Sequence, residues 1–477
     1  MQRSNANYFS YIRKERMSRL IDQQKNYSAD FGAIFRSSAI FFKPLNIKTT
    51  VSISNYWKFK NDIDVGIVIS YRNLKGKLIA REQPSFSTGH VLNIEVTHIE
   101  EGSVEIEAYS HKNLRIPYAA IMCIYETKGS ISMVHSYGRN HSLIELEDNS
   151  SITQARESCW TLRPSKDIRN LAVFHNGHVP LEEQFAKFIV STLLGSEKII
   201  NFSIPALQAY ESFIFDAEEI FPELYDFLEG GLGFGTLHFE SESSFTRLLV
   251  LWIDKVSNNI QVTHSNFDYS SHQTNILGET DTAYMELPSV RGRIPEVIVY
   301  PKFSEGSYVV NDQYKFDSAI QISAENSRLS ISRDDRKLPS RIVTAITDKI
   351  SDEAILPYEC SLGVLHQKRP PKRFHWFVAS SDYLSTIHIT SYEKIYPCDG
   401  AIELVCRMYS EASHFIDEKI LRFDSLGSVT KEIDVGSIFN LEDVKGYFYV
   451  SIFSAYGGLF IFSSIQKDNC LTIEHSF

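Results

Sequence analysis

The chain has 477 residues, which is enough for about three domains of roughly 150 residues each. Its 48 basic and 59 acidic side chains give a net charge of −11, which argues against nucleic acid as a partner, because proteins that bind nucleic acids usually contain a strongly basic domain. The 31 Phe and 24 Tyr residues favour a mainly β fold, since aromatic side chains suit the half-buried surface of a strand.

The N-terminal segment predicts a helix rather than a targeting signal. Residues 8–24 carry Phe9, Ile12 and Leu20 on one side, so we expect an amphipathic helix within residues 1–30. No apolar core of a secretory signal follows the polar first ten residues, and no apolar stretch approaches the ~20 residues of a membrane helix. The six cysteines include no C-x-x-C pair. We therefore expect a cytoplasmic protein with reduced thiols and no membrane span.

A pattern of two strands joined by a polar turn recurs along the chain. The second strand alternates apolar and polar residues, and it ends in a His or Thr that is followed by a Ser and soon by an aromatic residue. The pattern occupies residues 120–137, 247–267, 374–392 and 458–477, and its His or Thr positions are His135, His264, Thr390 and His475. Each copy predicts a β-hairpin. Because the order returns four times, the sequence predicts an internal repeat.

The repeat predicts tandem β-sandwich modules of the Greek-key kind. Strands of about five residues are separated by turn signals roughly every ten residues, as in such sandwiches. The predicted boundaries are 31–142 for module 1, 143–272 for module 2, 273–392 for module 3 and 393–477 for module 4, which is either complete or a closing half-module. A β-propeller is the less favoured alternative, because a blade of ~40–50 residues is much shorter than these intervals.

A helical insertion is expected in module 2, at about residues 180–229. Pro180 stands where a helix often begins, and apolar residues follow at helical spacing, namely Leu181, Phe185, Phe188, Ile189 and Leu193. A second helical stretch is expected from about residue 205 to 228, ahead of the glycine-rich segment 229–235. That segment lacks the preceding strand and following helix of a phosphate-binding loop, so we interpret it as a helix end and a turn.

Two loops that follow the recurring hairpins are candidate ligand-binding sites. Aromatic rings can stack on sugar rings while carboxylates accept hydrogen bonds from hydroxyl groups. The candidate residues are His135, Tyr137 and Arg139 in the first copy and His264, Phe267, Asp268 and Tyr269 in the second. The alternative is that these segments are ordinary turns, in which the Asp side chain caps its own backbone.

The His–Ser pairs at the hairpin ends are not expected to be catalytic. Neighbouring residues of a strand point to opposite faces, so the side chains of His135 and Ser136 should not act as a base and its nucleophile. We interpret these positions as strand ends. In the alternative, His135, His264 and His475 each face the same way within their own modules and contact a ligand there, with Thr390 replacing His in the third copy.

His175 and His178 form the densest cluster of possible metal ligands in the sequence. They lie three residues apart, with Glu182 nearby, and could bind zinc or iron if a distant carboxylate or His joined them. Asn176 and Gly177 between them form a strong turn dipeptide, so the alternative is a plain loop.

The sequence favours a non-enzymatic binding or structural protein whose repeated modules recognise a glycan, a glycoconjugate or another protein. Duplicated modules that share no catalytic residues more often provide several copies of a binding surface than several active sites. Fold alone does not define function. No cofactor is expected. The alternative is a metal-assisted enzyme, with zinc or iron held near His175 and His178.

Overall fold

The structure is a computed structural model. It describes residues 35–86, 89–110, 121–135, 137–141, 157–163, 165–241, 243–245, 247–266, 282–288, 290, 293–300, 306–323, 328–333, 338, 342–348, 356–363, 373–391, 396–398, 400–412, 416–426 and 430–476. The described part of the chain is mainly β, as predicted, with strands labelled β1 to β32 and a few short helices.

The first half of the chain supplies two groups of eight strands. The first group consists of β1 (Phe35–Lys43), β2 (Lys48–Ser54), β3 (Gly66–Asn73), β4 (Leu78–Glu82), β5 (Val91–Glu95), β6 (Gly102–Ser110), β7 (Ile121–Glu126) and β8 (Ile131–His135). The second consists of β9 (Glu157–Leu162), β10 (Ile168–His175), β11 (Gln184–Thr192), β12 (Glu197–Ile204), β13 (Ser212–Asp216), β14 (Gly233–His238), β15 (Leu249–Asp254) and β16 (Ile260–His264).

The second half of the chain supplies two more such groups. The third consists of β17 (Thr282–Glu286), β18 (Pro295–Val299), β19 (Tyr308–Val310), β20 (Tyr314–Phe316), β21 (Ile320–Ser323), β22 (Arg328–Arg333), β23 (Val343–Asp348) and β24 (Glu359–Gly363). The fourth consists of β25 (Phe374–Ser380), β26 (Leu384–Ser391), β27 (Ile402–Tyr409), β28 (Asp417–Phe423), β29 (Lys431–Asp434), β30 (Tyr447–Phe453), β31 (Leu459–Lys467) and β32 (Cys470–His475).

Each group forms two four-stranded antiparallel sheets, and the strand order is the same in all four groups. The sheets of the first group run β1-β6-β3-β4 and β5-β2-β7-β8. Adding 8, 16 or 24 to these strand numbers gives the two sheets of the second, third and fourth groups. Each final strand is paired on one side only, with the strand before it in the chain.

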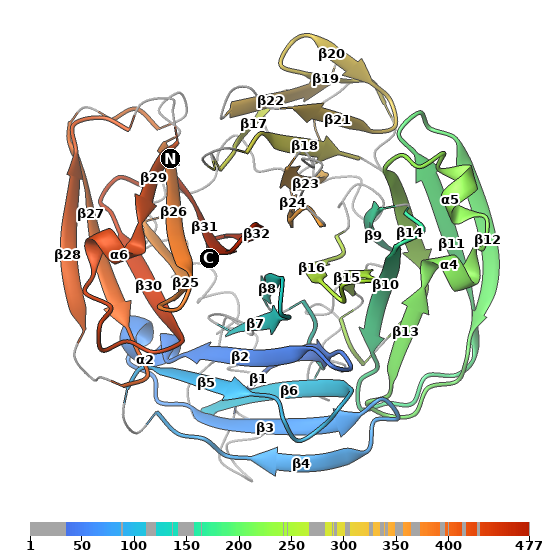
Figure 1. The fold of residues 1–477 in the computed structure, drawn as a ribbon, viewed down its shortest axis with the longest axis horizontal. Coiled ribbons are helices and arrows are strands. Elements are labelled where there is room, and N and C mark those ends of the chain that lie inside the picture. The colour runs from blue at the N-terminus through green and yellow to red at the C-terminus, as the bar shows by residue number, and fades with distance from the viewer. Residues whose placement is uncertain are drawn as a thin grey trace, which may run out of the picture.

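The four groups are arranged as a closed ring (Figure 1). Leu251 of β15 belongs to the buried cluster of the first group, and Phe462 of β31 belongs to that of the third. Phe234 of β14 stacks on Tyr300, next to β18, at a ring-centroid distance of 4.6 Å. Tyr449 of β30 packs into the first group, where its hydroxyl donates to the Ser52 carbonyl at 2.7 Å. Apolar contacts therefore join the first group to the last as well as to its neighbour in sequence.

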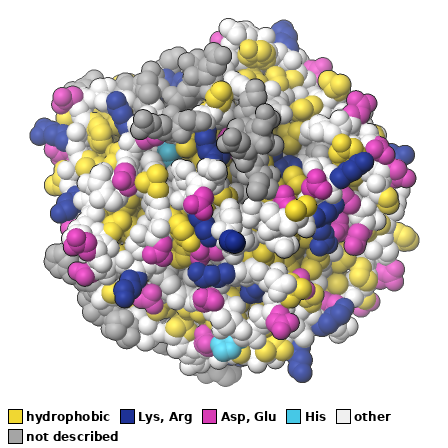
Figure 2. Space-filling view, in the orientation of Figure 1, with side chains coloured by type: hydrophobic (Ala, Val, Ile, Leu, Met, Phe, Trp, Pro, Cys, Tyr) yellow, Lys and Arg dark blue, Asp and Glu magenta, His cyan; other side chains and the backbone are white. Residues whose placement is uncertain are grey.

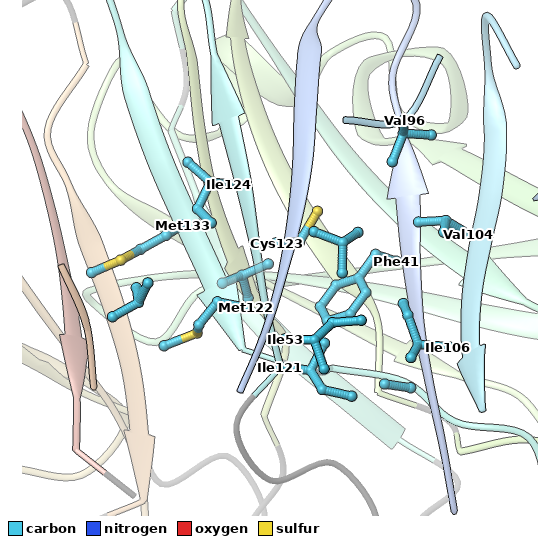
Figure 3. Packing of buried hydrophobic residues seen from close by; sticks show 14 of the residues in the cluster. Phe41, Ile53, Val96, Val104, Ile106, Ile121, Met122, Cys123, Ile124 and Met133 are labelled. Carbon is cyan, nitrogen blue, oxygen red and sulfur yellow. The ribbon is translucent and has the colours of Figure 1, made fainter. Parts of the chain in front are cut away.

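The strand β7, in the sheet β5-β2-β7-β8, is buried on both faces (Figure 3). Phe41 and Ile106, from the other sheet of the group, lie with Cys123 on one side of β7, while Met122 and Met133 lie on the opposite side. All five side chains are at most 1% exposed. Successive strand residues point to opposite faces, so double burial requires the continuous apolar run seen at residues 121–125.

The predicted helix over residues 180–195 is wrong, because this segment contains the strand β11. Its apolar residues follow a period of two: Ala186, Phe188 and Val190 are buried, whereas Phe185 is 91% exposed. The apolar residues of this segment matched helical spacing by chance, because the exposed Phe185 was counted as part of the buried face. The second predicted helical stretch is reduced to two short helices, α4 (Ala217–Ile220) and α5 (Leu224–Phe227).

Two other short helices are present in the described part of the chain, α2 (Tyr56–Asn61) and α6 (Val435–Ile438). The predicted N-terminal helix at 8–24 lies outside the described residues.

The third predicted hairpin, residues 374–392, is also wrong. Its two strands, β25 and β26, lie in different sheets, and they begin the fourth group. The hairpin at the equivalent place in the third group is β23–β24, in which Val343 pairs with Gly363. In the strand order, the third group ends with β24 and the fourth begins with β25, and the fourth group consists of eight strands. The sequence of β25, the short turn and β26 resembles that of a hairpin, because apolar and polar residues alternate in β26 as they do in the second strands of the true hairpins.

Charges of both signs are interspersed on the surface. In Figure 2, Lys and Arg side chains lie among Asp and Glu side chains over the face shown. No helix in the described part of the chain is long and apolar enough to cross a membrane.

Candidate functional site

The last strands of the four groups meet inside the ring (Figure 1). We call β8, β16, β24 and β32 the inner strands. β8 contacts β16 and β32, and β24 contacts the same two strands. The inner strands thus form a closed circle of neighbours, which brings segments from all four groups to one place.

Side-chain hydroxyls connect the inner strands to one another. The Val262 amide of β16 donates to the Ser132 hydroxyl of β8 at 2.9 Å, and the Ser361 amide of β24 donates to the Thr263 hydroxyl of β16 at 3.3 Å. The Met133 amide of β8 donates to Oγ1 of Thr472 in β32 at 3.0 Å. An edge strand normally leaves a row of amides unpaired, and these hydroxyls accept from some of them.

We expect Ser132→Ala to destabilise the protein by about 1–3 kcal/mol. The substitution removes the acceptor of the Val262 amide and the donor to Gln261 Oε1, at 3.1 Å, in a fully buried position. Leaving a buried polar group without a partner costs about that much. Ser196→Ala, in an exposed turn, is the matched control and should change the free energy of unfolding by less than about 0.5 kcal/mol. Equal effects of the two substitutions in urea titrations would contradict the bond between β8 and β16.

Three of the four positions singled out by the recurring pattern come together at the ends of the inner strands. The ring of His135 lies edge-on to that of His264, with 4.5 Å between centroids, and edge-on to that of His475, at 5.3 Å. The Glu474 carboxylate lies 3.3 Å from His135 Nδ1. His135, His264 and Glu474 are at most 4% exposed, and His475 is half-buried. These four side chains, which we call the histidine cluster, are the candidate site.

One ligand atom from each of His135, Glu474 and His475 lies within 4.8 Å of the others, and this is the only such group of three among the described residues. Among the described residues, the third group contributes no histidine, because its inner strand β24 contains none. The sequence favoured structural strand ends, and in the alternative each histidine faced the same way within its own module. Instead, three of the four groups of strands contribute to one shared cluster.

The environment of the histidine cluster perturbs two of its groups. Burial raises the pKa of Glu474 to about 7, against the opposing effect of His475 and Arg247. Burial also holds the pKa of His264 well below its ordinary value, and the nearby Arg247 guanidinium and His135 add to the decrease. His264 is therefore neutral at neutral pH.

The structure gives His264 and its neighbouring Ser separate partners. His264 Nδ1 lies 2.9 Å from the Ser265 carbonyl oxygen, not from the hydroxyl. The Ser265 hydroxyl instead accepts from the Leu248 amide at 2.7 Å and contacts the Ser158 hydroxyl. The pair therefore does not have the geometry of a base and its nucleophile.

The other predicted ligand-binding residues are placed differently. Tyr137 is 1% exposed and its ring packs edge-on against Phe41, with 6.1 Å between centroids. Arg139 is half-buried, and its carbonyl accepts from the Phe245 amide at 3.0 Å. Phe267, Asp268 and Tyr269 lie outside the described residues.

His175 and His178 lie apart from the histidine cluster, between the first and second groups. His175 ends β10, is 5% exposed, and its Nδ1 lies 2.7 Å from the Ser212 hydroxyl. Its ring also contacts Phe42, with 6.2 Å between centroids. His178 is half-buried in the following turn, as the Asn-Gly dipeptide indicated. Among the described residues, neither belongs to a set of three potential metal ligands.

His175 gives the protein a predictable response to acid. Burial lowers its pKa to about 3, with a smaller contribution from Arg72. Between about pH 3 and the ordinary pKa of ~6.5, the unfolded chain carries a proton on this histidine that the folded chain does not. The free energy of unfolding therefore decreases as the pH falls through this range. At pH 5 this group alone should cost about 2 kcal/mol relative to pH 7. We expect His175→Asn to lose that much less stability between pH 7 and 5 in urea titrations; an identical loss in both proteins would contradict a buried neutral His175.

The glycine-rich segment ends a helix, as the sequence indicated. α5 precedes it, Gly230 adopts a φ of +73°, and β14 follows from Gly233. A Cβ on Gly235 would come within 3.0 Å of the rings of Phe188 and Trp160. This glycine is therefore needed for aromatic packing rather than for holding a phosphate.

Comparison with known proteins adds no assignment: no protein-family description matches the chain, and no curated protein is similar to it.

Proposed function

We propose that this chain is a non-enzymatic binding or structural protein made of four copies of one eight-stranded β-sandwich module. The observation that supports the proposal is the strand order, which returns unchanged in every group. In the first group, side chains of both sheets share one buried cluster, as they would in a sandwich. A fourfold duplication would account for both the common order and the His-Ser strand ends.

A duplicated module offers several related loops around one ring, which suits recognition of a ligand larger than a single metabolite. The candidate ligand is a glycan or glycoconjugate, with a protein as the second possibility. The segment 266–269 supports the glycan, because it combines two aromatic residues with Asp268 directly after the inner strand β16. Aromatic faces and carboxylates together suit a polyhydroxylated ligand.

We also propose that the protein works in a reducing compartment such as the cytoplasm. Its six cysteines are all unpaired, and Cys123, Cys159, Cys360 and Cys406 are buried. Buried thiols of this kind act as small apolar side chains.

A glycan array tests the proposed ligand. The purified chain should bind at least one glycan class above background, and Asp268→Ala/Tyr269→Ala should lose that binding. Glu432→Ala, on the exposed side of β29, is the control and should bind like the unaltered protein. Absence of any signal, or equal signals from the loop variant and the unaltered protein, would reject the loop after β16 as a glycan site.

A further inference from the structure

We infer that the histidine cluster is a site for a divalent transition-metal ion, with His135, Glu474 and His475 as its protein ligands. The inference goes beyond the proposed ligand recognition and does not depend on it. It places the ion between β8 and β32, that is, between the first and the last group of strands.

The spacing of the three side chains supports metal binding. Their ligand atoms lie within 4.8 Å of one another. Ligands about 2.1 Å from a tetrahedral zinc ion are about 3.4 Å apart, so modest side-chain rotations would complete the coordination. Two imidazoles and one carboxylate form a common catalytic zinc ligand set and also suit Fe²⁺, whereas Ca²⁺ and Mg²⁺ prefer oxygen ligands alone.

A backbone carbonyl orients the ring of the proposed ligand His475. His475 Nδ1 faces the Ser476 carbonyl at 3.4 Å, and a carbonyl only accepts hydrogen bonds. The neutral ring of His475 therefore carries its proton on Nδ1, which leaves Nε2 unprotonated. His264 repeats this arrangement with the Ser265 carbonyl at 2.9 Å. A hydrogen bond from the other ring nitrogen to a backbone carbonyl is the usual support for a metal-binding histidine.

The charges around the cluster agree with an ion there. Glu474 is 4% exposed, and a buried carboxylate without a nearby positive charge is unfavourable. A divalent ion bound by this carboxylate would supply such a charge.

Because the ligands come from β8 and β32, the ion would link the first group of strands to the last. A metal that binds the folded chain alone raises its apparent stability with concentration. The expected readouts are therefore stoichiometric binding and a metal-dependent melting temperature, neither of which requires an enzymatic assay.

Equilibrium dialysis of the full chain, purified without a His-tag, against Zn²⁺ tests the inference. One Zn²⁺ per chain should bind, and Glu474→Gln and His475→Gln should each weaken that binding at least about tenfold. Co²⁺ should give a visible absorption band in the unaltered protein that both variants lack. Zn²⁺ should raise the melting temperature of the unaltered protein, but not that of Glu474→Gln.

His98→Gln, at an exposed histidine that pairs with Glu82 at 2.6 Å, is the control and should bind Zn²⁺ normally. His135→Gln provides a third ligand substitution; if it does not fold, the two variants in β32 still decide the question. The inference would be overturned if the unaltered protein bound no stoichiometric Zn²⁺ at micromolar concentration. It would equally be overturned if Glu474→Gln and His475→Gln bound Zn²⁺ as tightly as the unaltered chain.

Discussion

Replacing Phe188 by alanine is expected to destabilise the protein by about 3–5 kcal/mol, while the same change at Phe185 should alter stability by less than about 0.5 kcal/mol. Phe188 is fully buried, stacks on Trp160 at 5.9 Å and meets Phe215 edge-on at 4.7 Å between centroids. Phe185 is 91% exposed. The two residues are three apart, so they lie on opposite faces of the strand β11.

Urea titrations followed by tryptophan fluorescence measure both effects, because Trp160 lies in contact with Phe188. The pair of variants also separates a strand from a helix. In a helix, residues three apart share a face, and both substitutions would then be costly. Comparable losses from Phe185→Ala and Phe188→Ala would contradict the strand.

Arg163→Met is expected to cost about 3–5 kcal/mol, because it leaves the Glu359 carboxylate buried without its cation. Arg163 Nη2 donates to Glu359 Oε2 at 3.0 Å across the boundary between the second and third groups, and the side chains are 9% and 1% exposed. Thr161 also donates to that oxygen, at 2.5 Å. Burial raises the pKa of Glu359, while the Arg163 guanidinium opposes the increase.

The double variant Arg163→Met/Glu359→Gln is the matched control. Glutamine keeps an acceptor for Thr161 but carries no charge, so the double variant should recover most of the stability that the single variant loses. A single variant within about 1 kcal/mol of the unaltered protein would show that the two groups of strands are not joined by this ion pair.

Much of the fold could be predicted from the local sequence. The β class followed from short apolar runs between turn signals, and β7, β15 and β31 were each recognised within their hairpins. The errors arose where local patterns were ambiguous. The apolar residues of 180–195 fit helical spacing as well as a strand, and only the exposure of Phe185 distinguishes the two. The β25–β26 segment looks like a hairpin, although long-range pairing places its strands in separate sheets.

The candidate site was only partly predictable. The recurring pattern singled out His135, His264 and His475, but a single copy contains no information about the packing of one module against another. Glu474 was overlooked because the recurring pattern drew attention only to the positions that the copies share. The signal that could have found it was its position beside His475, in the one copy where a carboxylate precedes the histidine.

The inner strands, although each is an edge strand of its own sheet, bury one another inside the ring. Hydrogen–deuterium exchange tests this burial most directly. Peptides that cover β8, β16 and β32 should exchange as slowly as those from central strands, because most residues of these strands are buried and amides of β8 and β16 donate to neighbouring inner strands. Peptides from the exposed outer edge strands β4, β12 and β28 should exchange quickly. Fast exchange in both sets of edge strands would contradict the closed ring.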